Sequence, residues 1–538
     1  MLQKVQIKLD DKCSVWTDIQ IDSINVYFKG SFFYKERLYN SVDACNLIAT
    51  KFKEENARTR EKITEFLVEL NGYFGLVISF PEVCYVISDR LRSIPLFYST
   101  TGEETIITNN LINFNSTTCD ELSQIEFILT GLVSGKNTLL NTFKQLESGT
   151  FLEIKGKKIF INTYYEFTHN EIYEGQEIND LILELKATFY RSFQRLYDLV
   201  KHKEDIYLPL SGGYDSRLIA LMLKEFGINN VYCYTYGKNS NKEAKISKDV
   251  ANLLGYNWDF FEYTNDMWEQ MRKSNHLKKY YDYSFNGVSL PHMQDFPVVK
   301  DISYKLNENS IFIPGHSGDF LGGSHITTSI FSGNIIDVEK SVVDEIYSRH
   351  YYLWSIENNS LKNRLQKRIK SNISINLDHS LNEREQVANL FEYWDWKERQ
   401  SKFIVNSVRV YDFFGANWNM PLWDLELMNF FTKVPLRYRY NKLLYDQTLN
   451  FMFPSFFSKT SEKSSYLTNV KKKMYTNEII RYISQVRIAR NKHYLQWFSF
   501  INKNDLTFQK RLRNLKIRWP NHLNSYIAFD ILKNKLKE

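Results

Sequence analysis

Cysteine is scarce in this chain, with five residues among 538, and their odd number and scattered positions exclude a disulfide framework. No C-x-x-C pair and no histidines at zinc-ligand spacing accompany them, so a cysteine-based zinc site is also excluded. We therefore predict free, mostly buried thiols at Cys13, Cys45, Cys84, Cys119 and Cys233.

Long hydrophobic runs are also missing. Nowhere do eighteen apolar residues follow one another, and the first eleven residues, MLQKVQIKLDD, contain no apolar core of a signal peptide. These absences predict a cytoplasmic protein without a membrane span. Hydrophobic residues still make up 43% of the chain, which is enough for the cores of two or three domains.

Positive charge is concentrated at the end of the chain. Residues 471–538 hold sixteen Lys/Arg and four Asp/Glu, although the whole chain carries a formal net charge of only +7. Such a tail could contact RNA, a membrane surface or an acidic carrier, but periodic apolar residues favour helices with solvated basic faces. Zinc-finger and RNP patterns are absent, so the sequence gives no support for specific nucleic-acid binding.

The most informative segment is 205–217, which reads DIYLPLSGGYDSR and is followed by the apolar stretch 218–223. This pattern predicts a strand, a tight loop and a helix. Adjacent glycines let the backbone approach a ligand, and the free N–H groups of a helix N-terminus attract phosphate oxygens. A carboxylate at Asp215 would repel phosphate unless a divalent cation lay between them, so the loop predicts Mg²⁺ bound to a nucleotide.

This Ser-Gly-Gly-x-Asp-Ser loop resembles the pyrophosphate loop of ATP pyrophosphatases, and its surroundings resemble the asparagine synthetase family. Three further segments fit the family in order, and together they cover most of residues 205–450. They are the strand-like segment 231–237, the loop 311–323, which resembles the family's second signature loop, and the blocks 420–424 and 441–444, the latter of which contains Lys442.

The resemblance implies ATP and Mg²⁺ as cofactors and assigns roles by position. The implied pyrophosphate cradle is Ser211, Gly212, Gly213 and Ser216, and the implied metal ligands are Asp215 and Asp319. The resemblance further implies that Lys442 stabilises charge on the reacting phosphates, and that the adenosine pocket is lined by Leu210, Tyr236 and Gly315.

One position departs from the family pattern. The second loop reads PGHSGD, so His316 stands where the family has a glutamate that orients or deprotonates the attacking nitrogen. A histidine with a pKa near neutrality could serve as the base, or His316 could simply pack beside the loop. Both readings stay open, and the change leaves open whether aspartate is the substrate.

The segments 70–75 and 88–98 resemble the glutaminase domain of the same family, whose nucleophile is a cysteine directly after the initiator methionine. Here that position is Leu2, and Cys13 is the only early thiol, so we expect no glutamine hydrolysis by the isolated chain. Three residues match glutamine-holding positions of the family and are equally well explained as retained scaffold: Asn71, Gly72 and Asp89.

The predicted fold class is α/β with three parts. Residues 1–165 form an α+β Ntn-type sandwich, a degenerate glutaminase-like (class II amidotransferase) domain. Residues 175–460 form a synthetase domain with a parallel sheet of the adenine-nucleotide α-hydrolase (PP-loop) type and a helical C-terminal part, introduced by a long amphipathic helix at 178–200. Residues 461–538 form a basic, mainly helical extension.

The predicted function is an amide ligase that converts ATP to AMP and pyrophosphate while joining a small-molecule or peptide carboxylate to ammonia or an amine. Ring closure within one substrate, as in lactam or peptide cyclases of the family, is an alternative. A PP-loop adenylase acting on a tRNA base and a degenerate interaction protein are two others. A homodimer is left open, because the sequence does not determine the oligomeric state.

Overall fold

The computed structural model describes most of the chain up to residue 457 and a short C-terminal portion. The described ranges are 4–9, 15–101, 104–112, 114, 120–170, 173, 175–239, 242–373, 381–457, 512, 514–520 and 523–535. Leu2, Cys13, Cys119 and most of the predicted extension 461–538 lie outside them.

The N-terminal part contains a seven-stranded sheet with the order β11-β10-β6-β5-β3-β2, in which β4 also pairs with β3. Its strands alternate or bury apolar residues, as in β3, β5 and β10. The strands are β2 (Thr17–Ile21), β3 (Ile24–Tyr34), β4 (Arg37–Asn40), β5 (Asn71–Ser79), β6 (Cys84–Ser88), β10 (Thr150–Lys155) and β11 (Lys158–Thr163).

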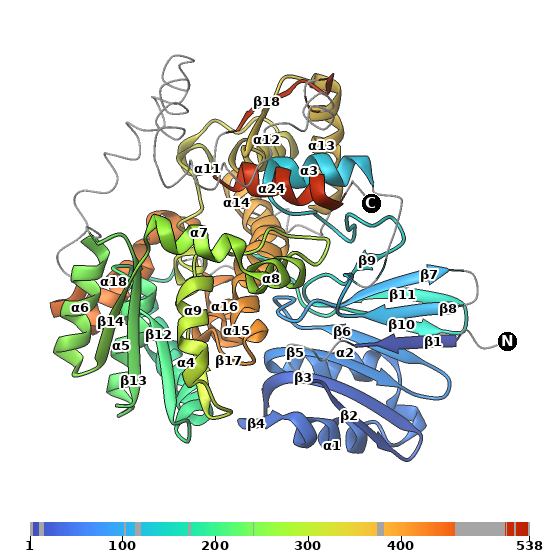
Figure 1. The fold of residues 1–538 in the computed structure, drawn as a ribbon, viewed down its shortest axis with the longest axis horizontal. Coiled ribbons are helices and arrows are strands. Elements are labelled where there is room, and N and C mark those ends of the chain that lie inside the picture. Colours follow the sequence, from blue (N-terminus) through green and yellow to red (C-terminus); the bar gives the residue numbers. More distant parts are fainter. Residues whose placement is uncertain are drawn as a thin grey trace.

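A second sheet of four strands packs on one face of the first (Figure 1). The apolar layer between the sheets includes Trp16, Val77, Val86 and Ile107, and the opposite face of the larger sheet is covered by two helices. The elements are β1 (Lys4–Lys8), β7 (Phe97–Thr101), β8 (Glu104–Thr108), β9 (Lys144–Gln145), α1 (Ser41–Lys51) and α2 (Arg60–Glu69), with the 3₁₀ turn η1 (Glu55–Ala57) between the helices and α3 (Glu121–Thr130) following.

The second part is built on a five-stranded, all-parallel sheet with the order β14-β13-β12-β15-β17. Its central strand is β12, where the apolar run before the Ser-Gly-Gly loop predicted a strand, and the three middle residues of β12 are buried. The predicted long amphipathic helix is α4, with the predicted bounds. The elements are β12 (Asp205–Pro209), β13 (Val231–Gly237), β14 (Asn257–Glu262), β15 (Ser310–Phe312), β17 (Asn417–Trp418), α4 (Ile178–Val200), α5 (Tyr214–Glu225), α6 (Lys242–Leu254) and α9 (Phe296–Ile302).

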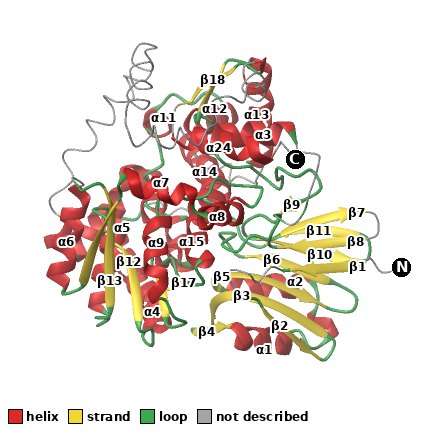
Figure 2. Cartoon of the chain, viewed as in Figure 1, coloured by secondary structure: helices red, strands yellow, loops and turns green. Residues whose placement is uncertain are grey.

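Helices dominate the chain after β14, and Figure 2 shows them in red. They begin with α7 (Asn265–Lys273), α8 (Asn275–Phe285) and η2 (Ser303–Lys305) and continue through α10 (Gly318–Leu321), α11 (Thr328–Ser332), α12 (Val338–His350) and α13 (Asn359–Asn372). One long helical rod then comprises α14 (Glu383–Trp394), the π-helix η3 (Asp395–Ile404), η4 (Val405–Val408) and α15 (Arg409–Phe413). The last helices of this part are η5 (Pro421–Trp423), α16 (Leu425–Phe431), α17 (Leu436–Arg439), η6 (Tyr440–Lys442), α18 (Leu443–Met452) and α19 (Pro454–Phe457).

The described end of the chain returns to this helical part. Strand β18 (Ile517–Pro520) pairs with β16 (Trp354–Ile356), and α24 (Leu523–Lys535) lies beside α3 (Figure 1). Ile527, Phe529 and Leu532 are buried, so this helix contributes apolar residues to the large core rather than lying free in solvent.

In the described part of the chain, every helix is too short or too polar to span a lipid bilayer. Cys45, Cys84 and Cys233 are free and buried, as predicted. Burial raises the pKa of the Cys84 and Cys233 thiols to about 12, so neither is a reactive thiolate near neutral pH.

Candidate functional site

Two carboxylates meet at the carboxyl ends of neighbouring strands. Asp215 lies in the first turn of α5, which follows β12, and Asp319 lies in the first turn of α10, which follows β15. The main-chain N–H of Asp319 donates a hydrogen bond to Oδ2 of Asp215 at 3.0 Å. The two residues that the resemblance implied as metal ligands are therefore side by side.

Glycines allow the two loops to approach this closely. A Cβ atom on Gly315 would lie 2.9 Å from the main-chain nitrogen of Ser216, and one on Gly318 would lie 3.0 Å from Cγ of Asp215. The first distance is shorter than real Cβ atoms show, and the second is tighter than nearly all Cβ contacts. The second loop thus packs its backbone directly against the first, and Gly315 belongs to this contact between the loops.

The serine hydroxyls shape the first loop. Oγ of Ser211 accepts a hydrogen bond from the N–H of Gly213 at 3.0 Å, and Oγ of Ser216 accepts one from the N–H of Ser211 at 3.1 Å. Gly213 itself is exposed, and a Cβ there would meet only Oγ of Ser211 within 4 Å. Open space beside Gly213 and the N-terminus of α5 suit phosphate oxygens.

The environment of the Asp215 carboxyl group disfavours its charged form. Burial raises its pKa to about 7, and the neighbouring charge of Asp319 acts in the same direction. The hydroxyl of Tyr445 donates to Oδ1 of Asp215 at 2.9 Å, while the carboxylate of Asp319 accepts from the N–H of Phe320 (2.8 Å) and the hydroxyl of Ser324 (3.1 Å). A divalent cation would relieve the repulsion between the two carboxylates.

The donor set fits Mg²⁺ bound together with a nucleotide. Among the described residues, no third Asp, Glu, His or Cys completes a metal-binding group around the pair. Mg²⁺ is usually held by one or two carboxylates, with phosphate oxygens and water as the other ligands. The pair matches that pattern and does not match a closed structural metal site.

Lys442 is brought to the first loop from a position far along the chain. Its Nζ lies 4.8 Å from the ring centre of Tyr214, the residue before Asp215, and donates to Oδ1 of Asp446 at 3.0 Å. Both Asn441 (φ 55°) and Lys442 (φ 60°) have left-handed backbone conformations. The charge of Lys442 lowers the pKa of Asp215, which opposes the effect of burial.

His316 is placed beside the second loop, but its environment differs from the one expected for a base with a near-neutral pKa. Burial lowers its pKa to about 4, and its Nε2 lies 2.7 Å from Oγ of Ser407. The imidazole is therefore neutral at pH 7 and a weak base. It remains able to accept or donate one hydrogen bond to a substrate.

The other two predicted adenosine-lining residues, Tyr236 and Leu210, differ in their exposure. Tyr236, at the end of β13, stacks on Tyr263 with ring centres 5.1 Å apart and hydrogen bonds to the buried Asp295. Leu210 is buried in the core below the loop, and its carbonyl oxygen accepts a hydrogen bond from the hydroxyl of Thr235. Tyr236 is thus partly exposed beside the loops, whereas the side chain of Leu210 is not.

Sequence reasoning missed several residues that position the site. Tyr445 follows Lys442 by three positions, so the helical spacing of α18 was the available signal for a partner of Asp215. No local pattern pointed to the residues that hold the second loop from other elements, which are Ser407, Gln400 and Asp395.

The residues that match glutamine-holding positions are used internally. Asp89 is fully buried and accepts hydrogen bonds from the N–H groups of Phe74, Leu91 and Ser93. The side chain of Asn71 donates to Asp424 at 2.9 Å and accepts from the N–H of Leu425 at 3.0 Å, which ties β5 to α16. Gly72 lies so close to β3 that a Cβ would be 2.3 Å from the carbonyl oxygen of Ser31.

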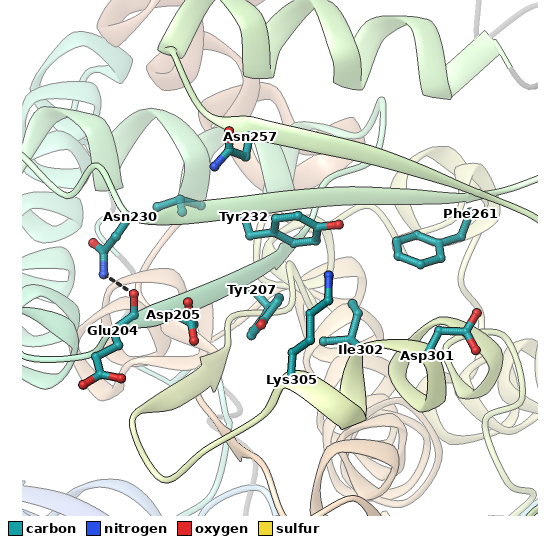
Figure 3. A pocket seen from close by; sticks show the side chains of 11 residues that line it. Glu204, Asp205, Tyr207, Asn230, Tyr232, Asn257, Phe261, Asp301, Ile302 and Lys305 are labelled. Atoms are coloured by element: carbon teal, nitrogen blue, oxygen red, sulfur yellow. Dashed lines mark hydrogen bonds between the residues drawn. The ribbon is translucent and has the colours of Figure 1, made fainter.

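A cavity of about 360 Å³ opens on the same parallel sheet, but most of its lining residues lie at or near the amino ends of β12, β13 and β14 or on α9 and η2 (Figure 3). Ligands of open α/β sheets bind at the carboxyl ends of the strands, where the two carboxylates lie. None of the predicted site residues lines the cavity. Its lining includes Asp205, Tyr207, Tyr232, Asn257, Phe261 and Lys305.

Comparison with solved structures adds little to this geometry. The allosteric regulatory enzyme of purine biosynthesis is 10% identical over 59% of this chain and 58% of its own, with a TM-score of 0.20. Glutamine phosphoribosylpyrophosphate amidotransferase from B. subtilis, complexed with ADP and GMP, is 8% identical over 60% and 62%, with a TM-score of 0.19. This chain therefore spans less than two thirds of either structure.

No curated protein matches the chain. The sequence profile of the asparagine synthase family, however, matches residues 200–493. This range is more than half of the chain and contains both loops, the two carboxylates and Lys442. The chain belongs to the asparagine synthase family.

Proposed function

We propose that this protein activates a carboxylate with ATP, forming AMP and pyrophosphate, and transfers the acyl group to ammonia or an amine. The observation that carries the proposal is the contact between Asp215 and Asp319 at the mouth of the Ser-Gly-Gly loop. A half-buried carboxylate pair beside a helix N-terminus matches what a metal-bound pyrophosphate group requires.

The proposed reaction has two steps. An oxygen of the substrate carboxylate attacks the α-phosphorus of ATP, and the bond from this phosphorus to the pyrophosphate oxygen breaks. The nitrogen nucleophile then attacks the acyl carbon, the bond from carbon to the phosphate oxygen breaks, and AMP leaves. The nitrogen loses one proton, so the products are an amide, AMP, pyrophosphate and a proton.

We assign roles to the chain's own residues in this reaction. The backbone at Gly212 and Gly213 binds the pyrophosphate, and Lys442 stabilises the charge that grows on it as it leaves. Asp215 and Asp319 would hold Mg²⁺, which when bound neutralises charge on phosphate oxygens.

His316 is assigned to orienting the nucleophile. With a pKa of about 4, its imidazole is uncharged at neutral pH and does not repel a cationic amine. A hydrogen bond from the nitrogen nucleophile to the imidazole would hold the nucleophile in line with the acyl carbon, while the proton passes finally to water or substrate phosphate. Ser407 fixes the ring from its other side.

The proposal is tested by product analysis over a panel of small and peptide carboxylates with Mg²⁺, ATP and either ammonium or an amine. Equal amounts of AMP and pyrophosphate support it, whereas ADP and phosphate contradict it. If both carboxylate oxygens are labelled with ¹⁸O, the mechanism places one label in AMP and leaves the other in the amide. A product lighter than its substrate by one water, formed without added amine, would indicate ring closure within the substrate.

A further inference from the structure

The π-helix η3 lies between the N-terminal part of the chain and the second loop. It runs from Asp395 to Ile404, whereas π-helical segments are usually single turns and are often found at functional sites. Most of its polar side chains are buried, including Asp395, Glu398, Gln400 and Lys402. Buried polar groups need partners, and those of η3 lie on two different sides.

On one side, η3 contacts the second loop at Ser317 and the segment just after the loop at His325. Oε1 of Gln400 accepts a hydrogen bond from the hydroxyl of Ser317 at 2.8 Å, and Oδ2 of Asp395 lies 2.5 Å from Nδ1 of His325. Ser317 and His325 stand on either side of Asp319 in the sequence. Ser324, next to His325, donates its hydroxyl to the carboxylate of Asp319.

The π-helical geometry allows both of these contacts to come from one helix. Nε2 of Gln400 donates to Oδ1 of Asp395 at 3.3 Å, so these residues, five positions apart, lie on the same face. In an α-helix with 3.6 residues per turn, they would lie roughly 140° apart. Ser317 has φ 70°, a conformation that a serine keeps only where the surroundings hold it.

On the other side, η3 contacts the N-terminal part of the chain. The carboxylate of Glu398 accepts a hydrogen bond from the N–H of Gly135 at 3.0 Å, and Nζ of Lys402 donates to the carbonyl oxygen of Gly135 at 2.7 Å. Trp396 donates its indole N–H to the carbonyl oxygen of Arg90 at 3.0 Å. The same ten residues therefore touch both the N-terminal part and the loop that carries Asp319.

We infer that η3 is a positioning element through which the docked N-terminal part of the chain fixes the metal ligand Asp319. The inference rests on the proposed function, because it takes Asp319 as a ligand of the metal that accompanies ATP. It gives the glutaminase-like part a role that needs no glutamine hydrolysis. Gln400 and Asp395 act through the second loop and are positioning residues.

The test uses the full-length protein and Mn²⁺ as the probe, with its binding measured by electron paramagnetic resonance at saturating ATP. Removing a partner that orients a metal ligand commonly weakens metal binding 10- to 100-fold. Gln400→Leu should therefore raise the Mn²⁺ dissociation constant by about 10-fold, and excess Mn²⁺ should restore pyrophosphate release. Trp396→Phe, which loses the hydrogen bond to Arg90 and part of a buried ring that packs on Phe167 and Tyr393, should raise the constant by a smaller factor.

Gln386→Leu is the matched control, because Gln386 lies on α14 of the same rod and its side chain donates to the nearby carbonyl oxygen of Leu381. Equal Mn²⁺ binding in Gln400→Leu and this control would overturn the inference. A defect in Gln400→Leu with parental binding in Trp396→Phe would overturn the link to the N-terminal part. If Gln400→Leu does not fold, Ser317→Gly removes the same hydrogen bond while relieving the backbone, and the same 10-fold effect is required.

The outcomes also separate this inference from the proposed function. A parent protein that binds Mn²⁺ with ATP but forms no AMP with any carboxylate contradicts the proposed reaction. A weaker Mn²⁺ affinity in Gln400→Leu would still support the role of η3 in that case. A parent protein that binds no Mn²⁺ with ATP contradicts both.

Discussion

The main-chain N–H of Asp319 donates a hydrogen bond to the carboxylate of Asp215, although 104 positions separate these residues in the chain. Each residue lies in the first turn of a helix that follows one of two paired parallel strands, β12 and β15. The backbone of one loop thus fixes the side chain of the other. A substitution that keeps the shape of Asp215 but removes its charge can therefore separate metal binding from folding.

Asp215→Asn should abolish metal-dependent ATP binding without unfolding the protein. Burial already raises the pKa of Asp215 to about 7, so a neutral side chain costs the fold little or nothing. The loss of a metal ligand should lower pyrophosphate release by at least about 100-fold. Mg²⁺·ATP binding by calorimetry and pyrophosphate release measure the two effects.

Asp205→Asn is the control for this change, because Asp205 begins β12 at the end away from the loop that carries Asp215. It should leave both measurements at the parental level. Unchanged turnover in Asp215→Asn would contradict the assignment of Asp215 as a metal ligand.

Tyr445→Phe should weaken metal binding less than Asp215→Asn does. The change removes one hydroxyl, which donates to Oδ1 of Asp215 at 2.9 Å, and keeps the ring in its packing. Loss of such an orienting hydrogen bond typically weakens metal binding by about 10-fold or more. Titration of pyrophosphate release with Mg²⁺ should show a higher half-saturating concentration at an unchanged maximal rate. An unchanged Mg²⁺ requirement would mean that Tyr445 has only a packing role.

Lys442→Ala should lower kcat by about 100-fold or more and leave ATP binding nearly unchanged. The reason is that Lys442, placed over the ring of Tyr214, would act on charge that develops only in the transition state. Lys442→Arg should restore little, because a planar guanidinium does not replace a compact ammonium at a fixed point. Rapid-quench measurement of pyrophosphate release separates the rate from binding.

Lys224→Ala is the matched control for Lys442. Lys224 also lies over a tyrosine ring, 5.5 Å from the ring centre of Tyr256, and also makes one side-chain hydrogen bond, to Asn229. This control should keep the parental rate. A rate of Lys442→Ala within about threefold of the parent would return Lys442 to the role of an ordinary surface lysine.

The sequence predicted those parts of the site whose signal is local. An apolar strand followed by Ser-Gly-Gly-x-Asp-Ser predicted the loop after β12, and amphipathic spacing predicted α4 with its observed bounds. The meeting of Asp215 with Asp319 depended on the family resemblance and on strand order, because nothing near either residue specifies the other. Parallel strands bring their carboxyl ends together only after the sheet has formed.

The remaining features depend on tertiary packing. The π-helical turn at Asp395 leaves no simple periodicity in the sequence, because its polar residues find partners in two other parts of the chain. The environment of His316 was also not predictable from its type, since burial beside Ser407 decides that its pKa is about 4. The expectation of a near-neutral base came from the residue alone.

Glutamine should not serve as the nitrogen donor for this chain, whereas ammonium should. Asp89 accepts hydrogen bonds from main-chain N–H groups, and Asn71 bonds to Asp424 and to the N–H of Leu425. These groups are therefore already engaged within the protein and are not available to hold a glutamine. The measurement is glutamate release from glutamine, with pyrophosphate release compared for glutamine and ammonium. Glutamate release that disappears in Cys13→Ala would contradict this expectation.

His350 should make the fold sensitive to acid. Its ring is buried against Phe391 and Trp394, with ring centres 5.8 and 4.9 Å apart, and burial lowers its pKa to about 3. The charge of Asp395 opposes this lowering, while Arg349 and Arg399 reinforce it.

Below the unfolded pKa of about 6.5, the unfolded chain therefore binds a proton that the folded chain does not, and the free energy of unfolding falls as the pH falls. His350→Phe keeps an aromatic ring and removes this proton, so its loss of stability between pH 7.5 and 5.0 should be smaller than the parent's by up to about 2 kcal/mol. Urea unfolding at the two pH values measures the difference, and His202→Phe, at an exposed histidine, is the control. Equal pH dependence in parent and His350→Phe would show that His350 does not contribute to acid sensitivity.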